Sequence, residues 1–316
     1  MSVLAIALNP TIDVSSEVAR VEPTRKMRTY NERRQAGGGG VNVARVIAEL
    51  GGRPDLLILA GGATGAMLQD ALRVLPVELH LVPISGSTRI AFMVHEEQTG
   101  LEYRFVPKGP EVSQRDITSA LKIVEEFKGD FVVASGSLPK GASEDTYAQM
   151  AGAAARNGAK FVLDCPGPIL RKVTGHAPIF LVKPSIGELE ILVGRRLDEK
   201  GLGEAASALV QNADADYVAV TMGREGALLA GRHGTLRVSS KHVVVQSAVG
   251  AGDSFVGALT WFLMQGRSVE EAFRFGVAAG AAAAMTPGTE LCRRDDVFAI
   301  YQDTEAARYV APGRKA

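Results

Sequence analysis

The residues best suited to do chemistry lie between positions 243 and 257, where a valine-rich run leads through a glycine turn into a helix-like stretch. Gly250 and Gly252 flank Ala251, and Asp253 follows directly. The free N–H groups of a helix's first turn attract anions, and glycines let a phosphate approach the main chain closely. An aspartate there can also take a proton from a hydroxyl, so the segment suits phosphoryl transfer to an alcohol. The competing interpretation is that Asp253 only caps a helix.

A second glycine cluster, residues 37–40, precedes Asn42 at the start of an amphipathic, helix-like stretch. Consecutive glycines leave backbone amides open to a polar ligand, and Asn42 can both donate to and accept from sugar hydroxyls. A flexible loop entering a helix is the alternative. Neither cluster has the GxxxxGK[ST] spacing of a P-loop, and 250–252 lacks the third glycine of the dinucleotide fingerprint, which disfavours a nicotinamide dehydrogenase.

The composition indicates a protein that acts on small molecules. The 316 residues are 46% apolar, and 35 lysines and arginines balance 35 aspartates and glutamates, so a general nucleic-acid surface is not expected. The cysteines, Cys165 and Cys292, form no CxxC pair and favour neither a disulfide framework nor a zinc site, which makes a reducing cytoplasm the expected location. The apolar N-terminus is too short for a membrane span and is better explained as a buried first strand.

The pattern of apolar runs predicts the elements that would position these residues. β-rich runs occur at 3–7, 56–60, 131–134, 161–163, 179–182, 217–220 and 242–245. Helix-like stretches lie between many of them, at 41–50, 66–74, 114–126, 144–156 and 204–211. Such alternation predicts an α/β fold, with a mostly parallel central sheet covered by helices on both faces. Ligands of these sheets sit beyond the carboxyl ends of the strands, so Asp253 and the loops after residues 60, 134 and 182 should converge.

Two segments interrupt the alternation. Residues 12–35 are polar and irregular, and 87–107 contain an expected hairpin around 97–100. We interpret both as a small β lid on one domain that spans 1–316. A lid would exclude water from a transferring phosphoryl group, and a projecting lid that pairs with a second copy makes a homodimer the expected assembly.

Two ordered motifs resemble those of the ribokinase-type sugar kinases, the PfkB family. They are residues 36–45 and 249–254, and supporting stretches are found at 8–13, 60–65, 135–139 and 274–280. The similarity covers nearly the whole chain. It implies a ribokinase-like fold and ATP, as its Mg²⁺ complex, as the phosphoryl donor.

The resemblance also implies roles for individual residues. Asp253 would draw the proton from the acceptor hydroxyl, while the amides of Gly250, Ala251 and Gly252 would stabilise the moving phosphoryl group. The implied sugar-phosphate ligands are Asp13, Gly38, Gly39, Asn42, Ser137 and three cations, Lys26, Arg28 and Arg89. Without the resemblance, Asp13 is explained nearly as well as a turn residue and the cations as solvated surface. Related fructose-1-phosphate and tagatose-6-phosphate kinases carry a lysine in the first motif where this chain has Gly39, which favours fructose 6-phosphate.

The nucleotide side is implied by two further segments. Lys183 and Ser185 begin a stretch similar to the family's NxxE element, in which Glu188 would order Mg²⁺ and its waters. This chain has serine in place of the asparagine, and Ser185 and Glu188 also have the spacing of an ordinary capping box. Thr221, Gly223 and Gly226 would form a nucleotide-binding loop, which a plain turn explains equally well. Residues 286–290 depart from the family pattern at both ends, which leaves a K⁺ site there open.

The implied reaction is transfer of the γ-phosphoryl group of MgATP to the 1-hydroxyl of fructose 6-phosphate, giving fructose 1,6-bisphosphate in glycolysis. One alternative is a tagatose-6-phosphate or fructose-1-phosphate kinase of the same family. Another, from a different class, is a sugar-phosphate sensor that has lost turnover. A panel of acceptors assayed for ADP release separates the three.

Overall fold

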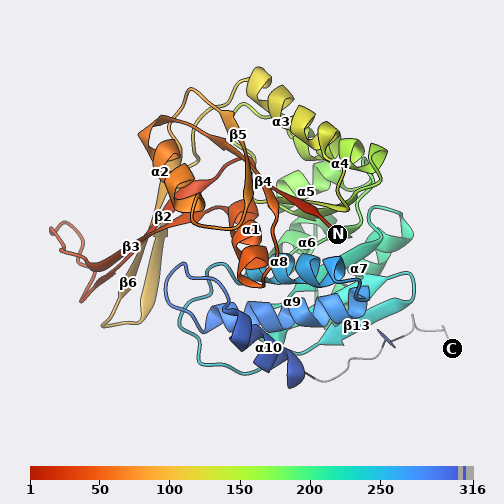
Figure 1. Ribbon diagram of the computed structural model, residues 1–316. Helices are drawn as coiled ribbons and strands as arrows, with labels where there is room; N and C mark the ends of the chain where they lie inside the picture. The colour runs from red at the N-terminus through yellow and green to blue at the C-terminus, as the bar shows by residue number, and fades with distance from the viewer. Residues whose placement is uncertain (305–308, 311–316) are drawn as a thin grey trace.

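The computed structural model describes residues 1–304, 309 and 310, and these form two sheets of unequal size (Figure 1). The larger sheet has, in spatial order, strands β14 (Tyr309–Val310), β13 (Gly234–Val238), β12 (Ala227–Gly231), β11 (Tyr217–Thr221), β10 (Leu181–Val182), β9 (Lys160–Asp164), β8 (Phe131–Ser135), β1 (Val3–Ala7), β4 (Asp55–Ala60) and β5 (Glu78–Pro83). The strands from β5 across to β11 run parallel, and β12 to β14 continue antiparallel.

Both faces of this sheet are buried, because side chains of a strand alternate between its two sides. In β1, Val3, Ala5 and Ala7 join one hydrophobic core, while Leu4 and Ile6 join the other. The central strands therefore read as continuous apolar runs, as is typical of parallel sheets covered on both sides.

Helices cover the two faces in separate layers. The first core is closed by α1 (Gly39–Glu49), α2 (Gly62–Leu72), α8 (Ala251–Met264), α9 (Val269–Ala284) and α10 (Arg294–Gln302). The second is closed by α3 (Gln114–Glu126), α4 (Thr146–Arg156), α5 (Gly167–Val173), α6 (Ile186–Val193) and α7 (Glu199–Gln211). The α/β prediction is thus confirmed. None of the helices in the described residues has the length and apolar character needed to cross a bilayer.

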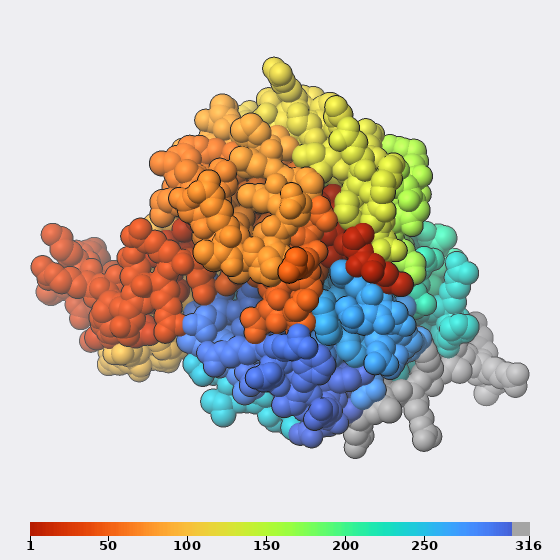
Figure 2. Space-filling view, in the orientation of Figure 1, coloured from red at the N-terminus to blue at the C-terminus, as the bar shows by residue number. Residues whose placement is uncertain are grey.

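The smaller sheet projects from the main body at the left of Figures 1 and 2. Its strands, in order, are β3 (Tyr30–Gly37), β2 (Thr11–Val18), β6 (Arg89–Glu96) and β7 (Leu101–Phe105). They come from the two segments in which we expected a lid, and a short connection joins β1 to β2 while β3 leads almost directly into α1. Lid function stays a prediction, and the end of the expected domain, 305–308 and 311–316, lies outside the described residues.

One expected strand is absent. Residues 239–246 carry no helix or strand, and Val244 is 84% exposed, so the prediction of a strand at 242–245 is wrong. The preceding strand, β13, already has β12 on one side and β14 on the other, which leaves no free edge for the valine run to pair with. The segment instead carries the chain from the sheet to α8.

Candidate active site

The start of α8 provides an open helix end. Its N-cap is Gly250, whose φ of +74° lies in the left-handed region that favours glycine, and no side chain caps the helix. A Cβ atom at Gly250 would also lie 2.6 Å from Leu291 Cδ2. The N–H groups of the first turn therefore remain available to an anion, as the sequence predicted from Gly250, Ala251 and Gly252.

Asp253 lies within the first turn of α8, and its carboxylate is turned toward a neighbouring helix. Its Oδ2 accepts a hydrogen bond of 2.8 Å from Asn42 Nδ2 in α1. The alternative that Asp253 serves as the N-cap is wrong, since that position is occupied by Gly250. The two glycine motifs of the sequence thus meet through one side-chain contact.

Burial raises the pKa of Asp253 from 3.8 to about 7, and the negative charge of Asp164 adds to this effect. The hydrogen bond from Asn42 and the charge of Lys183 act in the opposite direction. A carboxylate with such a pKa is well matched to accept a proton near neutral pH.

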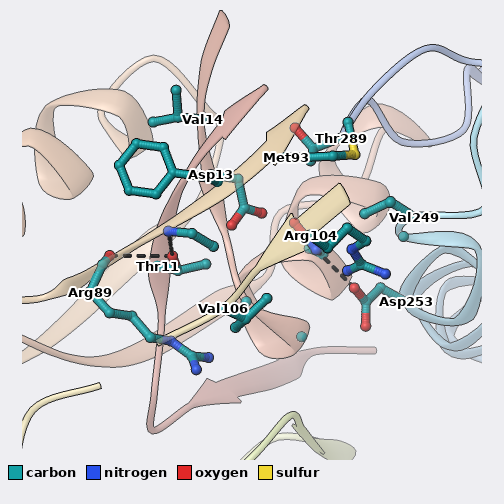
Figure 3. Close-up of a pocket in the computed structure, with 16 residues that line it drawn as sticks. Thr11, Asp13, Val14, Arg89, Met93, Arg104, Val106, Val249, Asp253 and Thr289 are labelled. Carbon is teal, nitrogen blue, oxygen red and sulfur yellow. Dashed lines mark hydrogen bonds between the residues drawn. The ribbon is translucent and has the colours of Figure 1, made fainter. Parts of the chain in front are cut away.

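A cavity of about 180 Å³ opens beside Asp253, between the small sheet and the main domain (Figure 3). The predicted residues that line it are Asp13, Gly38, Gly39, Asn42, Arg89, Gly250 and Asp253. Arg104 from β7 and Thr289 also line it, so the small sheet and the starts of α1 and α8 contribute.

On the side of the small sheet, the cavity brings one carboxylate close to several cations. Burial raises the pKa of Asp13, while the charges of Arg45, Arg89 and Arg104 lower it. Arg89 donates to the backbone oxygens of Asn9 (2.7 Å) and Pro107 (2.9 Å), which fixes its guanidinium at the base of the small sheet.

Ser137 lies nearby but outside the cavity lining. Asn9 Nδ2 donates to Ser137 Oγ at 3.2 Å and to the backbone oxygen of Lys108 at 3.0 Å. Asn9 thus ties the connection after β1 to the segment after β8. Arg89 donates to the carbonyl oxygen of the same asparagine, so Asn9 contacts both Ser137 and Arg89.

Lys26 and Arg28 are not brought to the cavity. Both are exposed in the segment between β2 and β3, at the far end of the small sheet. Within a single chain, the structure therefore separates these two predicted phosphate ligands from Asp253.

A buried ion pair lies on the other side of the α8 mouth. Lys183 Nζ is 3.0 Å from Asp164 Oδ1, and only 6% of the lysine side chain is exposed. Burial opposes the lysine's charge, but Asp164, Glu188 and Asp253 together raise its pKa. A Cβ atom at Gly252 would lie 3.6 Å from Lys183 Nζ, so the ammonium sits directly beside the helix end.

Ser185 and Glu188 form the capping box of α6. Ser185 Oγ accepts from the Glu188 amide at 3.3 Å, and Glu188 Oε2 accepts from both the amide and the hydroxyl of Ser185 at 2.8 Å. An isolated bridge pairs Ser185 with Thr221, and Gly223 and Gly226 frame the short turn after β11. The predicted nucleotide residues are therefore neighbours at the carboxyl ends of β10 and β11.

Sequence reasoning missed three charged residues of the site. Asp164 is the last residue of β9. The rule that ligands sit beyond the carboxyl ends of strands could have identified it, as it did for the loop that contains Lys183. Arg45 follows Asn42 by one helical turn and donates to it, and Arg104 lies on β7 between the half-buried Tyr103 and the exposed Phe105. Arg45 is the last residue of the motif at 36–45, but nothing in that motif assigned it a role, and Arg104 belongs to no motif.

The chain matches the model of the pfkB family carbohydrate kinases over residues 2–296. It is 40% identical to the ATP-dependent 6-phosphofructokinase isozyme 2 of Mycobacterium tuberculosis strain H37Rv over 306 residues, which cover 95% of this chain and 89% of that protein. Crystal structures of Escherichia coli phosphofructokinase-2 in complex with fructose-6-phosphate and with potassium superpose with TM-scores of 0.90 and 0.92. Both are 36% identical in sequence, and each comparison covers 96% of this chain and 98% of the other.

Proposed function

Since the chain belongs to the pfkB family of carbohydrate kinases, we propose that it transfers the γ-phosphoryl group of MgATP to the 1-hydroxyl of fructose 6-phosphate, giving fructose 1,6-bisphosphate. Its ribokinase-like α/β fold and the names of its relatives support an ATP-dependent sugar kinase. The observation that carries the proposal is Asp253, a carboxylate with a pKa of about 7 in a cavity at an uncapped helix end.

In this reaction Asp253 takes the proton from the acceptor hydroxyl as its oxygen attacks the γ-phosphorus. The bond between that phosphorus and the bridging oxygen of ATP breaks, and ADP leaves. The amides of Gly250, Ala251 and Gly252 hold the equatorial oxygens of the moving group, and Lys183 adds a positive charge beside them. Positioning and charge stabilisation of this kind supply most of the rate of phosphoryl transfer.

The sugar phosphate would occupy the cavity between the small sheet and the starts of α1 and α8. Asp13 and Asn42 offer polar groups to its hydroxyls, beside the backbone of Gly38 and Gly39. Arg89, with Ser137 nearby, would bind the 6-phosphate, for which a guanidinium fork is well shaped. Lys26 and Arg28 would contact the 6-phosphate as well only if their segment moved or a second copy of the chain supplied them.

The nucleotide would lie over Thr221, Gly223 and Gly226, with its phosphates toward Lys183. The carboxylates present fit Mg²⁺, which prefers few protein ligands together with phosphates and water. Glu188 is half-buried with its Oε2 held by Ser185, and the charges of Glu188 and Asp164 interact. Among the described residues no group of three potential ligands could hold a metal by itself. When bound, Mg²⁺ would neutralise charge on the nucleotide's phosphates.

K⁺ is the monovalent ion to test, because an E. coli phosphofructokinase-2 structure contains potassium. In this chain Thr286 Oγ1 already donates to the backbone oxygens of Ala283 (2.7 Å) and Glu290 (2.9 Å), which closes the 286–290 loop on itself. Turnover that rises in KCl but not in NaCl at equal ionic strength would support a K⁺ site.

A homodimer through the small sheet is the assembly that we propose. Directly paired residues share a sheet face, and Phe92 on β6 pairs with Phe105 on β7. Their side chains are 48% and 61% exposed, and Leu101 on the same face is 55% exposed. Exposed apolar patches of this kind mark interaction sites. We also propose a cytoplasmic location, which accords with the two proposed substrates.

The dimer is tested by measuring molecular mass in solution by light scattering. Phe105→Asp should convert dimers to monomers, while Val74→Asp, at a position 83% exposed near the end of α2, should not. A wild-type protein that is monomeric at micromolar concentration would rule this assembly out.

The reaction is tested with a panel of acceptors assayed for ADP release. Fructose 6-phosphate should give the highest kcat/KM, ahead of tagatose 6-phosphate and fructose 1-phosphate. A higher value for either of the others would reassign the substrate, and ligand binding without ADP release from any acceptor would identify a sensor.

A further inference from the structure

The contact between Asn42 and Asp253 is held at a fixed distance by the packing of α1 on α8. A Cβ atom at Gly257 would lie 2.8 Å from Val46 Cβ and 3.0 Å from the backbone oxygen of Val43. The two helices can therefore approach this closely only because residue 257 has no side chain. Their backbones fix where the amide of Asn42 meets the carboxylate, but they do not fix which end of the amide faces it.

An asparagine amide has one donor end and one acceptor end, and a half-turn about its last bond exchanges them. With the oxygen turned toward Asp253, two acceptors would face each other in a partly buried site, and the hydrogen bond to the base would be lost. A further contact is therefore needed to favour the orientation in which Asn42 Nδ2 donates to Asp253 Oδ2 at 2.8 Å.

Arg45 does so from the same face of α1, three residues further along. Its guanidinium donates to Asn42 Oδ1 at 3.2 Å and to the backbone oxygen of Ala36 at 2.8 Å. A guanidinium has donors only, so it can pair with the oxygen of the Asn42 amide but never with its NH₂ group. The bond to Ala36, at the end of β3, holds the arginine in place.

The charge of Arg45 also belongs to this site. Burial lowers the pKa of Arg45, and its attraction to Asp13, Asp253 and Glu290 offsets part of that loss of solvation. Asp164, Lys183 and Asp13 also act on the charge of Asp253, Asn42 donates a hydrogen bond to it, and Arg89 and Arg104 line the same cavity. Loss of the Arg45 charge, which attracts the Asp253 carboxylate, would make ionisation of Asp253 harder.

We propose that Arg45 is a positioning residue for the base: it locks the Asn42 amide with its NH₂ group on Asp253 Oδ2, so that Oδ1 receives the proton of the acceptor hydroxyl. This inference rests on the proposed kinase function and extends it to a residue that does not line the cavity. It predicts that Arg45 acts through Asn42.

The test compares Arg45→Met with Arg45→Lys, and with Arg73→Met as the matched control. Arg73 is an exposed arginine at the end of α2 that forms an exposed ion pair with Asp70. Misplacement of a catalytic group by about an ångström costs roughly 100-fold, so Arg45→Met should lower kcat by about 10- to 100-fold. The acid limb of its kcat–pH profile should move to higher pH, while the Kd of MgATP stays unchanged. Arg45→Lys should recover part of kcat and most of the pH limb, because it keeps the charge and one donor.

A double-mutant cycle decides whether the arginine works through the amide. In an Asn42→Ala background, Arg45→Met should cost much less kcat than it does alone. An equal loss in both backgrounds, or a kcat within twofold of wild type with an unmoved acid limb, would overturn the proposal. If Arg45→Met does not fold, as judged by circular dichroism, the same cycle is run with Arg45→Lys.

The comparison uses whichever acceptor the wild type phosphorylates best. A different preferred sugar phosphate would therefore overturn the proposed substrate without affecting the result for Arg45. Absence of ADP release with every acceptor would overturn both.

Discussion

Replacing Asp253 by asparagine should lower turnover and raise stability together, a combination that a merely structural residue would not give. The asparagine side chain still offers an oxygen to Asn42 Nδ2, so the link between α1 and α8 survives. What is lost is the base. General-base contributions of roughly 100- to 10,000-fold correspond to about 3–5 kcal/mol of activation free energy.

The stability change follows from the pKa of Asp253, which burial raises from 3.8 to about 7. The folded state then binds this proton more tightly than the unfolded state, so the free energy of unfolding falls as pH rises from about 4 to about 7. An asparagine has no charge to bury. At pH 8, Asp253→Asn should therefore gain about 4 kcal/mol, and the gain should vanish near pH 4.

The assays are coupled ADP release for kcat and calorimetric titration for the Kd of both substrates. Thermal unfolding is measured at about pH 4.5 and about pH 8, on the two sides of the pH range in which Asp253 titrates. Asp295→Asn is the matched control, because Asp295 is an exposed carboxylate in the first turn of α10. It should leave kcat unchanged. Wild-type turnover in Asp253→Asn, or a melting temperature that does not rise at pH 8, would refute the reasoning.

Three further predictions concern the same site. The kcat–pH profile of the wild type should rise through an apparent pKa of about 7, since only the ionised Asp253 accepts a proton, and an acid limb near pH 4 would contradict this. Lys183→Met should cost about 3–5 kcal/mol of unfolding free energy in urea, because it leaves Asp164 buried without its partner, and adding Asp164→Asn should recover much of that loss. Gly250→Ala should cost about 1–2 kcal/mol from its left-handed φ, with more from the contact to Leu291, and should lower kcat. Thermal unfolding and ADP release measure the two effects. If neither the melting temperature nor kcat changed, the start of α8 would not be strained by a side chain at position 250.

Much of the layered architecture could be predicted from the sequence, because apolar runs and helical periodicity report burial directly. The helix α3 has the predicted bounds of 114–126, and the glycine turn at 250 does lead into a helix. The valine run at 242–245 misled the prediction, since composition cannot show that β13 already has a neighbour on each side.

The charged side chains of the site were harder to foresee. Asp164 and Lys183 are distant in the sequence, and only the parallel order of β9 and β10 brings them to one edge. Arg45 looks like an ordinary helix residue until the contact with Asn42 is seen. Lys26 and Arg28 were assigned by resemblance alone, and nothing in their local sequence reveals where a loop at the end of the small sheet will lie.

The close approach of α1 and α8 at Gly257 has a consequence for how acceptor preference can evolve. Because the spacing between Asn42 and Asp253 is set by two interlocked main chains, a substitution that shifts one helix at Gly257 moves both side chains of this contact together. The side chains of β2, β6 and β7 line the opposite wall of the cavity and can change one at a time without disturbing the helices.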